Sequence, residues 1–231
     1  MAMHKTLYTQ FGKRFFDAVL AALGLIILSP LLALIAIAVR VTSRGPVIFS
    51  QQRTGQFEKP FVILKFRSMR SAPTGKGALL TAAGDPRVTP LGYWLRKTKM
   101  DELPQLWNVL SGDMSLVGPR PEVPYYTRRY NSIQKRVLLA KPGITSPKIN
   151  FDEEALMASQ PDKEELYLSE ILPAKLACDL TYAENIHFFT DVKILFVTVS
   201  QLFLRPLGFV SKPVAPASAA ADRHVSDPSN A

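Results

Sequence analysis

The longest apolar stretch of the chain lies at residues 18–39, where it is interrupted only by Gly24, Ser29 and Pro30. A helix rises ~1.5 Å per residue, so a straight helix of this length covers the hydrocarbon core of a bilayer. The stretch is longer than the apolar region of a signal peptide, and no small-residue cleavage site follows it. This pattern predicts a membrane-inserted helix; a buried helix of a soluble protein is the alternative.

Two features indicate that this helix turns back inside the membrane. Basic residues flank both ends of the run, with Lys13 and Arg14 before it and Arg40 and Arg44 after it. Positive flanks favour the cytoplasmic side, so both ends favour the same side. Pro30 predicts a kink, and the Ser29 hydroxyl is a candidate donor to a carbonyl freed near residue 26. We expect a re-entrant helix; an ordinary kinked span is the alternative.

Shorter β-prone and helical segments follow the apolar run. Residues 47–49 and 61–66 are short β-prone runs separated by a polar connection around Gly55, which predicts a β-hairpin. Residues 71–90 are rich in Gly, Pro, Thr and Ala, and we expect a long loop there. Helical spacing returns at residue 91, and further helices are expected at residues 124–139, 152–165, 173–184 and 191–204.

These segments predict an α+β fold that is mainly helical, with a small β-hairpin and an N-terminal re-entrant membrane helix. We expect three parts. Residues 1–44 form the membrane-inserted part, and residues 45–209 form a cytoplasmic domain. Residues 210–231 are rich in Ala, Pro, Ser and Asp, which is typical of a disordered tail.

Charge and cysteine content limit the chemistry. The 231 residues carry a formal net charge of +9, which favours nucleic acid, anionic lipid or phosphorylated substrates as partners. Cys178 is the only cysteine, so an internal disulfide and a cysteine-based metal site are excluded. The three histidines show no ligand spacing, and a histidine-rich metal site is not expected.

The most informative short motif is Asp-Glu-Leu-Pro-Gln at residues 101–105. Pro104 is tolerated in the first turn of a helix, so a helix is expected to begin near Asp101. Free amides and the helix dipole then favour the ionised forms of Asp101 and Glu102. An ionised carboxylate can act as a nucleophile or bind a divalent cation. Plain helix capping is the alternative, since acidic residues are common in first turns for that reason alone.

Basic residues surround this acidic pair in the sequence. Arg87, Arg96, Lys97 and Lys99 precede it, and Arg120 follows within the Gly-Pro-Arg-Pro motif at residues 118–121. A carboxylate that attacks a phosphate needs cations that offset the charge repulsion, either Arg and Lys or Mg²⁺. Arginine suits this task because it binds phosphate in a bidentate manner. For Arg120, a turn with a solvated arginine is the alternative.

Several further motifs occur in a fixed order between residues 13 and 204. They are Lys13-Arg14, Ser29-Pro30, Gln52-Arg53, Lys-Phe-Arg-Ser-Met at 65–69, the acidic motif at 101–105, Asn-Val-Leu-Ser-Gly-Asp-Met-Ser-Leu-Val-Gly-Pro-Arg-Pro-Glu at 108–122, Lys-Pro-Gly-Ile-Thr at 141–145 and Asp-Val-Lys-Ile-Leu at 191–195. With these motifs the chain resembles the bacterial sugar transferase family. These are the monotopic phosphoglycosyl transferases that start glycan assembly on polyprenyl phosphate.

The resemblance implies a role for five residues. Asp101 matches the nucleophile, which forms a covalent phosphosugar intermediate and expels UMP. Glu102 matches the neighbouring Mg²⁺ ligand. Arg96 and Arg120 match basic residues near the substrate phosphates, and Asp191 matches a further acidic residue of the site.

The resemblance also implies an activity and a location. The chain would move a sugar 1-phosphate from a UDP-sugar to polyprenyl (undecaprenyl) phosphate, which initiates a capsule, exopolysaccharide, O-antigen or glycoprotein glycan. Residues 45–209 would then be a catalytic domain on the cytoplasmic face of the bacterial inner membrane. Its partners would be the UDP-sugar, polyprenyl phosphate and membrane lipid, with no nucleic acid.

Two other functions fit parts of the sequence. A non-catalytic, membrane-anchored basic protein that binds nucleic acid or anionic lipid would satisfy the composition. It gives no reason for the acidic pair beside clustered arginines, and no helix-turn-helix or aromatic stacking motif supports it. A degenerate transferase that serves as a scaffold is the other candidate, and the intact Asp101–Glu102 pair argues against it.

Overall fold

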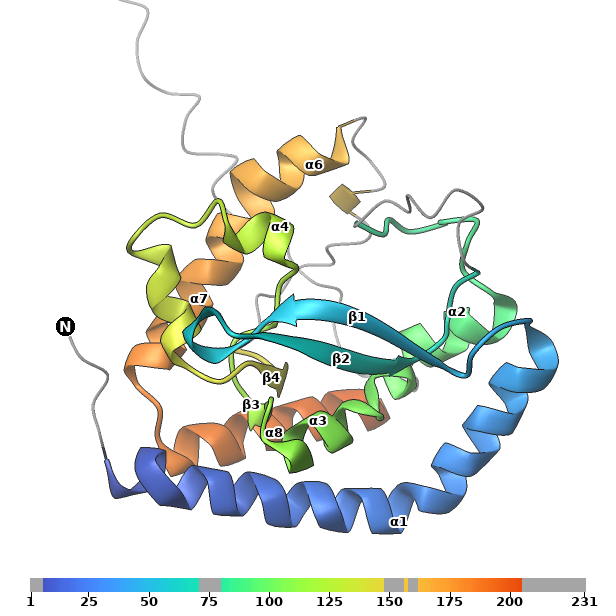
Figure 1. The fold of residues 1–231 in the computed structure, drawn as a ribbon, viewed down its shortest axis with the longest axis horizontal. Helices are drawn as coiled ribbons and strands as arrows, with labels where there is room; N and C mark the ends of the chain where they lie inside the picture. Colours follow the sequence, from blue (N-terminus) through green and yellow to red (C-terminus); the bar gives the residue numbers. More distant parts are fainter. Residues whose placement is uncertain (1–5, 71–79, 148–155, 158–161, 205–231) are drawn as a thin grey trace, which may run out of the picture.

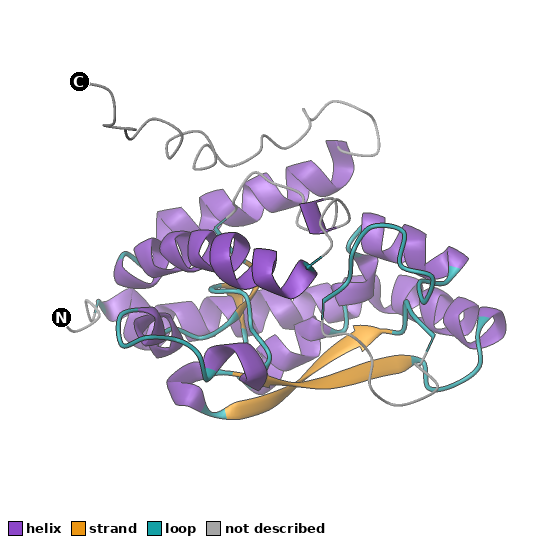
Figure 2. Cartoon of the chain, turned by 90° about the horizontal axis from the view of Figure 1, so that it is seen from above, coloured by secondary structure: helices purple, strands orange, loops and turns teal. Residues whose placement is uncertain are grey.

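The structure is a computed structural model that describes residues 6–70, 80–147, 156–157 and 162–204. Helices predominate in the described residues, and the strands form two sheets of two strands each (Figures 1 and 2). This confirms the predicted fold class: α+β, mainly helical, with a small hairpin and a long apolar N-terminal helix. The predicted tail at 210–231, most of the expected helix at 152–165 and the first part of the expected loop, residues 71–79, lie outside the described residues.

The N-terminal helix α1 (Lys13–Thr42) continues a π-helical turn, η1 (Tyr8–Gly12). Among the described helices it alone is long and apolar enough to cross a membrane, and little of its apolar segment is buried. Pro30 lies inside it, and Figure 1 shows α1 as two arms joined by a bend. The Ser29 hydroxyl donates to the Ile26 carbonyl oxygen at 2.8 Å, which confirms the predicted donor.

Both arms of α1 pack against the rest of the protein. In the first arm, the Asp17 carboxylate accepts a hydrogen bond of 2.7 Å from the Ser115 hydroxyl. At the end of the second arm, the Arg67 guanidinium donates to the carbonyl oxygens of Ser43 at 2.7 Å and Val39 at 3.3 Å. These donors satisfy carbonyls that a helix end leaves without intrahelical partners. The helix is therefore attached to the body at both ends.

The predicted hairpin is present. Strands β1 (Ile48–Thr54) and β2 (Pro60–Phe66) pair antiparallel over their whole length and are joined by the 3-10 turn η2 (Gln56–Glu58). Ile63 and Phe66 of β2 are buried, and because they are three positions apart they point to opposite faces of the strand. Ile63 and Phe66 accordingly belong to two different core clusters, so both faces of β2 are partly covered.

The remaining elements follow in a mainly helical order. They are α2 (Pro90–Lys97), η3 (Met100–Glu102), α3 (Gln105–Ser111), β3 (Ser115–Val117), α4 (Pro124–Thr127), η4 (Gln134–Leu139), β4 (Gly143–Thr145), α6 (Lys163–Leu166), η5 (Tyr167–Ile171), α7 (Leu172–Glu184) and α8 (Phe188–Leu204). The helices expected from residue 91, at 173–184 and at 191–204 are thus confirmed. Helix α3 contacts both β2 and α1, and it lies between the hairpin and α1 in Figure 1.

The single helix predicted at residues 124–139 is wrong. The chain forms only the short helix α4 and the 3-10 helix η4, with a break between them. In the break, the Asn131 side-chain oxygen accepts hydrogen bonds from the amides of Ile133 at 3.0 Å and Gln134 at 2.8 Å. An asparagine that binds the amides two and three residues ahead starts a new turn in place of a continuing helix.

A parallel pair of short strands, β3 and β4, has no counterpart in the sequence prediction. The chain comes very close to itself just beyond this pair. A Cβ atom on Gly143 would lie 2.1 Å from the Gly118 nitrogen, and one on Gly118 would lie 2.3 Å from the Lys141 carbonyl oxygen. Only glycine fits at either position, and this close approach fixes the segment that leads to Arg120.

Buried apolar residues form three clusters. One comprises Ala21, Ile63, Val109, Met114, Leu116, Val117, Ala140, Tyr182, Ala183 and Ile186, and joins α1 to the hairpin, α3, β3 and α7. A second, centred on Tyr126, Tyr167 and Leu176, supports α4, η5 and α7. The third contains Ile35, Val39, Phe66 and Leu95 and ties the second arm of α1 to β2 and α2. Burial of each large apolar side chain contributes about 1.5–3 kcal/mol to stability. Because α1 residues belong to two of these clusters, this burial stabilises the attachment of α1 to the body.

Candidate active site

The acidic pair lies in a turn of its own. Lys99 adopts a left-handed backbone conformation (φ 58°, ψ 14°) after α2, and Asp101 and Glu102 follow in the 3-10 turn η3. Pro104 precedes α3, which begins at Gln105. The predicted helix start near Asp101 is therefore wrong by about one turn. The missing amide hydrogen of Pro104 is tolerated at the helix start, where amides have no intrahelical partner.

Glu102 is buried between two cations. Its Oε1 accepts hydrogen bonds from the Lys65 ammonium at 2.8 Å and from the Arg120 guanidinium at 2.9 Å. Burial raises the pKa of Glu102, but the charges of Arg120, Lys65 and Lys99 outweigh it and hold that pKa well below its usual range. Glu102 is therefore ionised at neutral pH.

Asp101 is in a different state although it is adjacent. It is 5% exposed, and its Oδ1 accepts no hydrogen bond from any residue that the structure describes. Burial, and then the charge of Glu102, raise the pKa of Asp101, while Lys65, Lys99 and Arg96 lower it in part. The expectation that helix amides would favour the ionised form is wrong for this residue. The raised pKa makes the carboxylate more basic and a better nucleophile when ionised.

Cations approach the pair from three segments. Lys65 comes from β2, Arg96 from α2 and Arg120 from the loop after β3. Arg96 is close enough to Asp101 to lower its pKa, and its guanidinium also contacts the Met69 sulfur at 3.7 Å. The structure thus brings together four of the five site residues expected from the sequence. Three cations around two carboxylates suit a substrate with several negative charges.

The loop that carries Arg120 is held by its backbone. The amide of Thr54 donates to the Glu122 carbonyl oxygen at 2.9 Å, and the amide of Gly143 donates to the Pro119 carbonyl oxygen at 2.9 Å. The Arg120 amide donates to the buried carboxylate of Asp179. These contacts come from β1, β4 and α7, so the position of Arg120 depends on all three elements.

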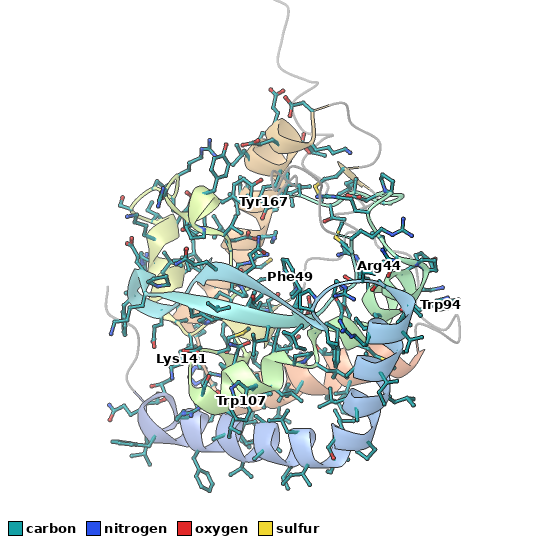
Figure 3. All side chains as sticks on the ribbon, turned by 45° about the vertical axis from the view of Figure 1, so that its right-hand side comes forward. Arg44, Phe49, Trp94, Trp107, Lys141 and Tyr167 are labelled. Carbon is teal, nitrogen blue, oxygen red and sulfur yellow. The ribbon has the colours of Figure 1, made fainter. Side chains whose placement is uncertain are left out.

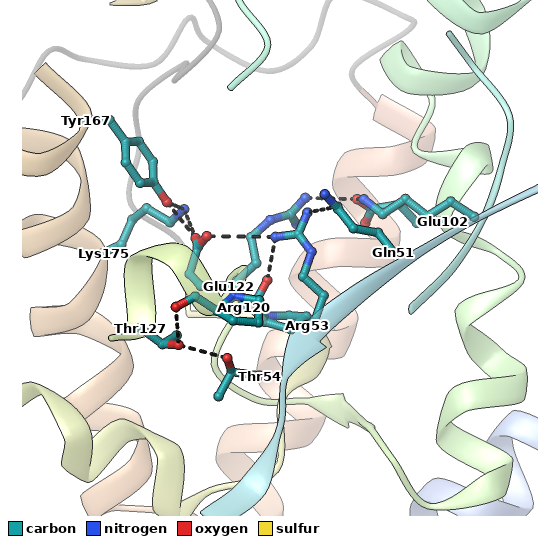
Figure 4. Close-up of polar contacts among 12 residues, drawn as sticks. Gln51, Arg53, Thr54, Glu102, Arg120, Glu122, Thr127, Tyr167 and Lys175 are labelled. Carbon is teal, nitrogen blue, oxygen red and sulfur yellow. Dashed lines mark hydrogen bonds and ion pairs between the residues drawn. The ribbon is translucent and has the colours of Figure 1, made fainter. Parts of the chain in front are cut away.

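A further buried carboxylate, that of Glu122, lies beyond Arg120 (Figure 4). It accepts hydrogen bonds from the Tyr167 hydroxyl at 2.6 Å and the Lys175 ammonium at 2.9 Å, and Arg53 is 3.8 Å away. Burial raises the pKa of Glu122, but Lys175 and Arg53 outweigh it and hold the pKa below the usual range. Arg53 also donates to the Pro121 carbonyl oxygen at 3.1 Å. This network fastens the Arg120 loop to β1 and α7.

Sequence reasoning missed most of this support. Lys65 lies in the motif at residues 65–69 and Glu122 in the motif at 108–122, but the sequence predicted no role for either side chain. Lys175 and Tyr167 lie outside these motifs, and they reach Glu122 because η5 and α7 pack against α4 in the second core cluster. Their contribution is a property of the tertiary structure.

Asp191 lies in a separate cluster. Its carboxylate accepts hydrogen bonds of 2.6 Å from each of three groups: the Tyr8 hydroxyl, the Lys13 ammonium and the Tyr182 hydroxyl. It is 1% exposed, and its described hydrogen bonds do not reach Asp101 or Glu102. The predicted part of Asp191 in the substrate site stays a prediction. In the structure it joins the start of α1 to α7 and α8.

The acidic pair also fits a divalent cation. No three His, Cys, Asp or Glu side chains gather as a metal site within the described part of the chain. Mg²⁺ does not need such a cage, because it binds through one or two carboxylates, several waters and substrate phosphates. Two carboxylates are present here. Oδ1 of Asp101 has no hydrogen bond within the described residues, and Glu102 is ionised. The donors fit Mg²⁺ bound together with a phosphorylated substrate.

Comparison with known proteins places these residues in a wider group. Residues 8–205 match the family model described as bacterial sugar transferase. The chain is 40% identical over 204 residues to the UDP-glucose:undecaprenyl-phosphate glucose-1-phosphate transferase of Escherichia coli (strain K12), an alignment that covers 87% of this chain and 40% of the relative.

Two further relatives show the same similarity. The chain is 38% identical over 194 residues to the UDP-glucose:undecaprenyl-phosphate glucose-1-phosphate transferase of Caulobacter vibrioides, covering 82% of this chain and 69% of the relative. It is 34% identical over 200 residues to a UDP-N-acetylgalactosamine-undecaprenyl-phosphate N-acetylgalactosaminephosphotransferase of Aeromonas hydrophila, covering 82% and 43%. The chain spans less than half the length of the Escherichia coli and Aeromonas relatives.

Proposed function

Because this chain belongs to the bacterial sugar transferase family, we propose that it transfers a sugar 1-phosphate from a UDP-sugar to a polyprenyl phosphate and releases UMP. The names of the relatives support this donor and this acceptor. The observation that carries the chemistry is the buried Oδ1 of Asp101, which has no hydrogen bond within the described structure and lies beside an ionised Glu102 and three cations.

The reaction proceeds in two displacements. An oxygen of Asp101 attacks the phosphorus that carries the sugar, and the bond from that phosphorus to the oxygen of UMP breaks, so UMP leaves with the electron pair. A phosphate oxygen of the polyprenyl phosphate then attacks the same phosphorus. The bond to Asp101 breaks, and the carboxylate is restored. The product is a polyprenyl diphosphate that carries the sugar, which is the lipid-linked start of a glycan.

The other residues stabilise charge. Arg120 and Arg96 bind phosphate oxygens of the donor, and Lys65 keeps Glu102 ionised. We expect Asp101 and Glu102 to hold Mg²⁺, which when bound neutralises charge on the diphosphate. With chelator present, turnover is expected to stop, and added Mg²⁺ is expected to restore it. Full activity in a chelator would exclude this role for Glu102.

The first half-reaction gives a test that needs no acceptor. A covalent intermediate predicts that radiolabelled UMP exchanges into the UDP-sugar when enzyme and donor are mixed without polyprenyl phosphate. Mass spectrometry should then find a phosphosugar adduct on Asp101. A panel of UDP-sugars in the same assay identifies the donor. Absence of exchange, combined with UMP release that requires the acceptor, would contradict the two-step route.

The attachment of α1 supports a re-entrant topology at the cytoplasmic face of the inner membrane. Both of its arms pack on the same body, through Asp17 near one end and Arg67 near the other. A helix that spanned the bilayer would carry one of these ends away from the body. For a test, Cys178→Ser and Met3→Cys place one cysteine before α1. A thiol reagent that cannot cross the inner membrane should leave it unlabelled in intact cells and label it after lysis; efficient labelling in intact cells would contradict this topology.

A further inference from the structure

An apolar groove lies between the second arm of α1 and helix α2, close to the acidic pair. It is lined by Leu34, Ile35 and Ala38 from α1 and by Leu91, Trp94, Leu95, Thr98 and Met100 from α2 and the turn after it. Its volume is about 270 Å³. The hydroxyl of Thr98 donates to the Trp94 carbonyl oxygen at 2.8 Å, so even the polar side chain in this set has its own partner.

We propose that this groove binds the hydrocarbon tail of the polyprenyl phosphate at its phosphate end. This rests on the proposed transfer to polyprenyl phosphate. The groove is slightly smaller than the ~300–1,000 Å³ of typical small-molecule sites, so it holds a few isoprene units and leaves the rest of the tail in the membrane. Its apolar lining offers no hydrogen bond to a polar ligand, whereas a branched hydrocarbon needs none.

The position of the groove matches the polarity of such an acceptor. Met100 lines the groove, and Asp101 is the next residue. Arg96 is on the same helix as three groove residues, and its charge is close enough to Asp101 to lower the pKa of that carboxyl group. An anionic head at the cations and an apolar tail in the groove would therefore lie on the two sides of one turn. A ligand with this arrangement is an amphiphilic phosphate.

The groove also borders the apolar helix α1, which we expect to insert into the membrane. One wall belongs to α1, the membrane-inserted helix, and Leu34 on that wall is largely exposed. On the opposite wall, Trp94 is 60% exposed, and the Lys97 ammonium lies 5.2 Å from the centre of its indole ring. Figure 3 shows Trp94 on the outer side of α2. An exposed tryptophan next to a lysine is typical of the headgroup level of a bilayer, where the tail of a membrane-borne acceptor is available.

The test fills the groove. Ala38→Phe places a ring in it, and Ala33→Phe adds the same ring at an exposed position of α1 that does not line it. Ala38→Phe should raise the KM for undecaprenyl phosphate about tenfold and leave the UMP exchange reaction, which uses no acceptor, within twofold of wild type. Ala33→Phe should leave both unchanged. A wild-type KM in Ala38→Phe would overturn the groove as the acceptor site.

A second measurement on the wild-type protein covers the case in which Ala38→Phe does not fold. An undecaprenyl phosphate analogue with a diazirine in its first isoprene units should cross-link to the peptides that contain Leu91–Leu95 or Leu34–Ala38. Undecaprenyl phosphate should compete, and phosphatidylglycerol at the same concentration should not. Cross-links elsewhere would show that the groove is not the acceptor site. Equal competition by phosphatidylglycerol would show that the groove holds any membrane lipid, which would also overturn the proposal. Wild-type protein without UMP exchange would contradict the proposed function itself, which is a separate outcome.

Discussion

The buried carboxylates of Glu102 and Asp191 have different surroundings in this protein. Glu102 binds Lys65 and Arg120, and the Arg120 side chain is 38% exposed, so the cluster is open on that side. Asp191 binds two tyrosine hydroxyls and Lys13, a cation whose side chain is 12% exposed. The first cluster is accessible to a ligand, whereas the second is closed and joins the chain's first and last described helices.

The comparison shows that burial of an acid does not by itself identify a site. Both residues are nearly inaccessible, and both lie within the stretch that matches the family model. They differ in what surrounds the carboxylate. Glu102 lies between Lys65 and the partly exposed Arg120, beside an oxygen of Asp101 that has no hydrogen bond within the described residues. Two hydroxyls and Lys13 complete the hydrogen bonding of Asp191.

The largest effect is expected at Asp101. Asp101→Asn removes the nucleophile and keeps the shape, so UMP release should fall at least 10³-fold, which is about 4 kcal/mol of transition-state stabilisation. The thermal unfolding of the detergent-solubilised variant should stay close to that of wild type. Activity within tenfold of wild type would contradict the assignment of the nucleophile.

The second effect separates the two clusters. Asp191→Asn leaves Lys13 without its buried counter-charge, which should cost about 3 kcal/mol of stability and lower the unfolding temperature. Measured on the protein that remains folded, UMP release should fall less than tenfold. If activity is lost with no change in unfolding, Asp191 belongs to the chemical site, as its motif predicts.

A smaller effect is expected at Arg120. Arg120→Lys keeps the charge but removes the guanidinium fork, which should lower kcat/KM for the UDP-sugar about 10–30-fold. The matched control is Arg128→Lys, an exposed arginine eight positions later in the sequence. It should be within twofold of wild type, and an equal loss in both variants would show that the effect is not specific to the position of Arg120.

The smallest effect is a shift with pH. The first step needs ionised Asp101, and burial raises its pKa, so the rate should fall on acidification at a pH above the ordinary aspartate value of ~3.9. Glu102 stays ionised throughout, because its pKa is lowered. Arg96 lowers the pKa of Asp101, and Arg96→Gln should therefore move this acid limb to higher pH. A pH–rate profile of UMP exchange measures the limb, and a shift to lower pH would contradict the sign.

Much of the architecture could be predicted because it depends on local patterns. The apolar run, the kink at Pro30, the hairpin and helix α7 each follow from composition and spacing within a short window. The acidic pair could be recognised because its motif is continuous in sequence. These features require no knowledge of distant contacts.

The features that were missed depend on contacts between distant segments. Strands β3 and β4 have three residues each, too few for a periodic signal, and they exist because Gly118 and Gly143 allow the two segments to meet. The upward pKa shift of Asp101 comes from burial by neighbouring elements, which outweighs the local amides that sequence reasoning considered. The break at Asn131 depends on local hydrogen bonds to the Ile133 and Gln134 amides. It was missed because the basic and apolar residues on either side follow a helical pattern.

The two-ended attachment of α1 has a consequence for the order of events during synthesis. Asp17 and its partner Ser115 are 98 residues apart, and Tyr8 and Asp191 are 183 residues apart. At ~5–20 residues per second, roughly 10–40 s pass between synthesis of Tyr8 and of Asp191. The ribosome therefore delivers α1 before the segments that hold it exist. Under the proposed insertion, α1 enters the bilayer first and the body then folds onto it, so the nascent chain would acquire its location before it acquires an active site.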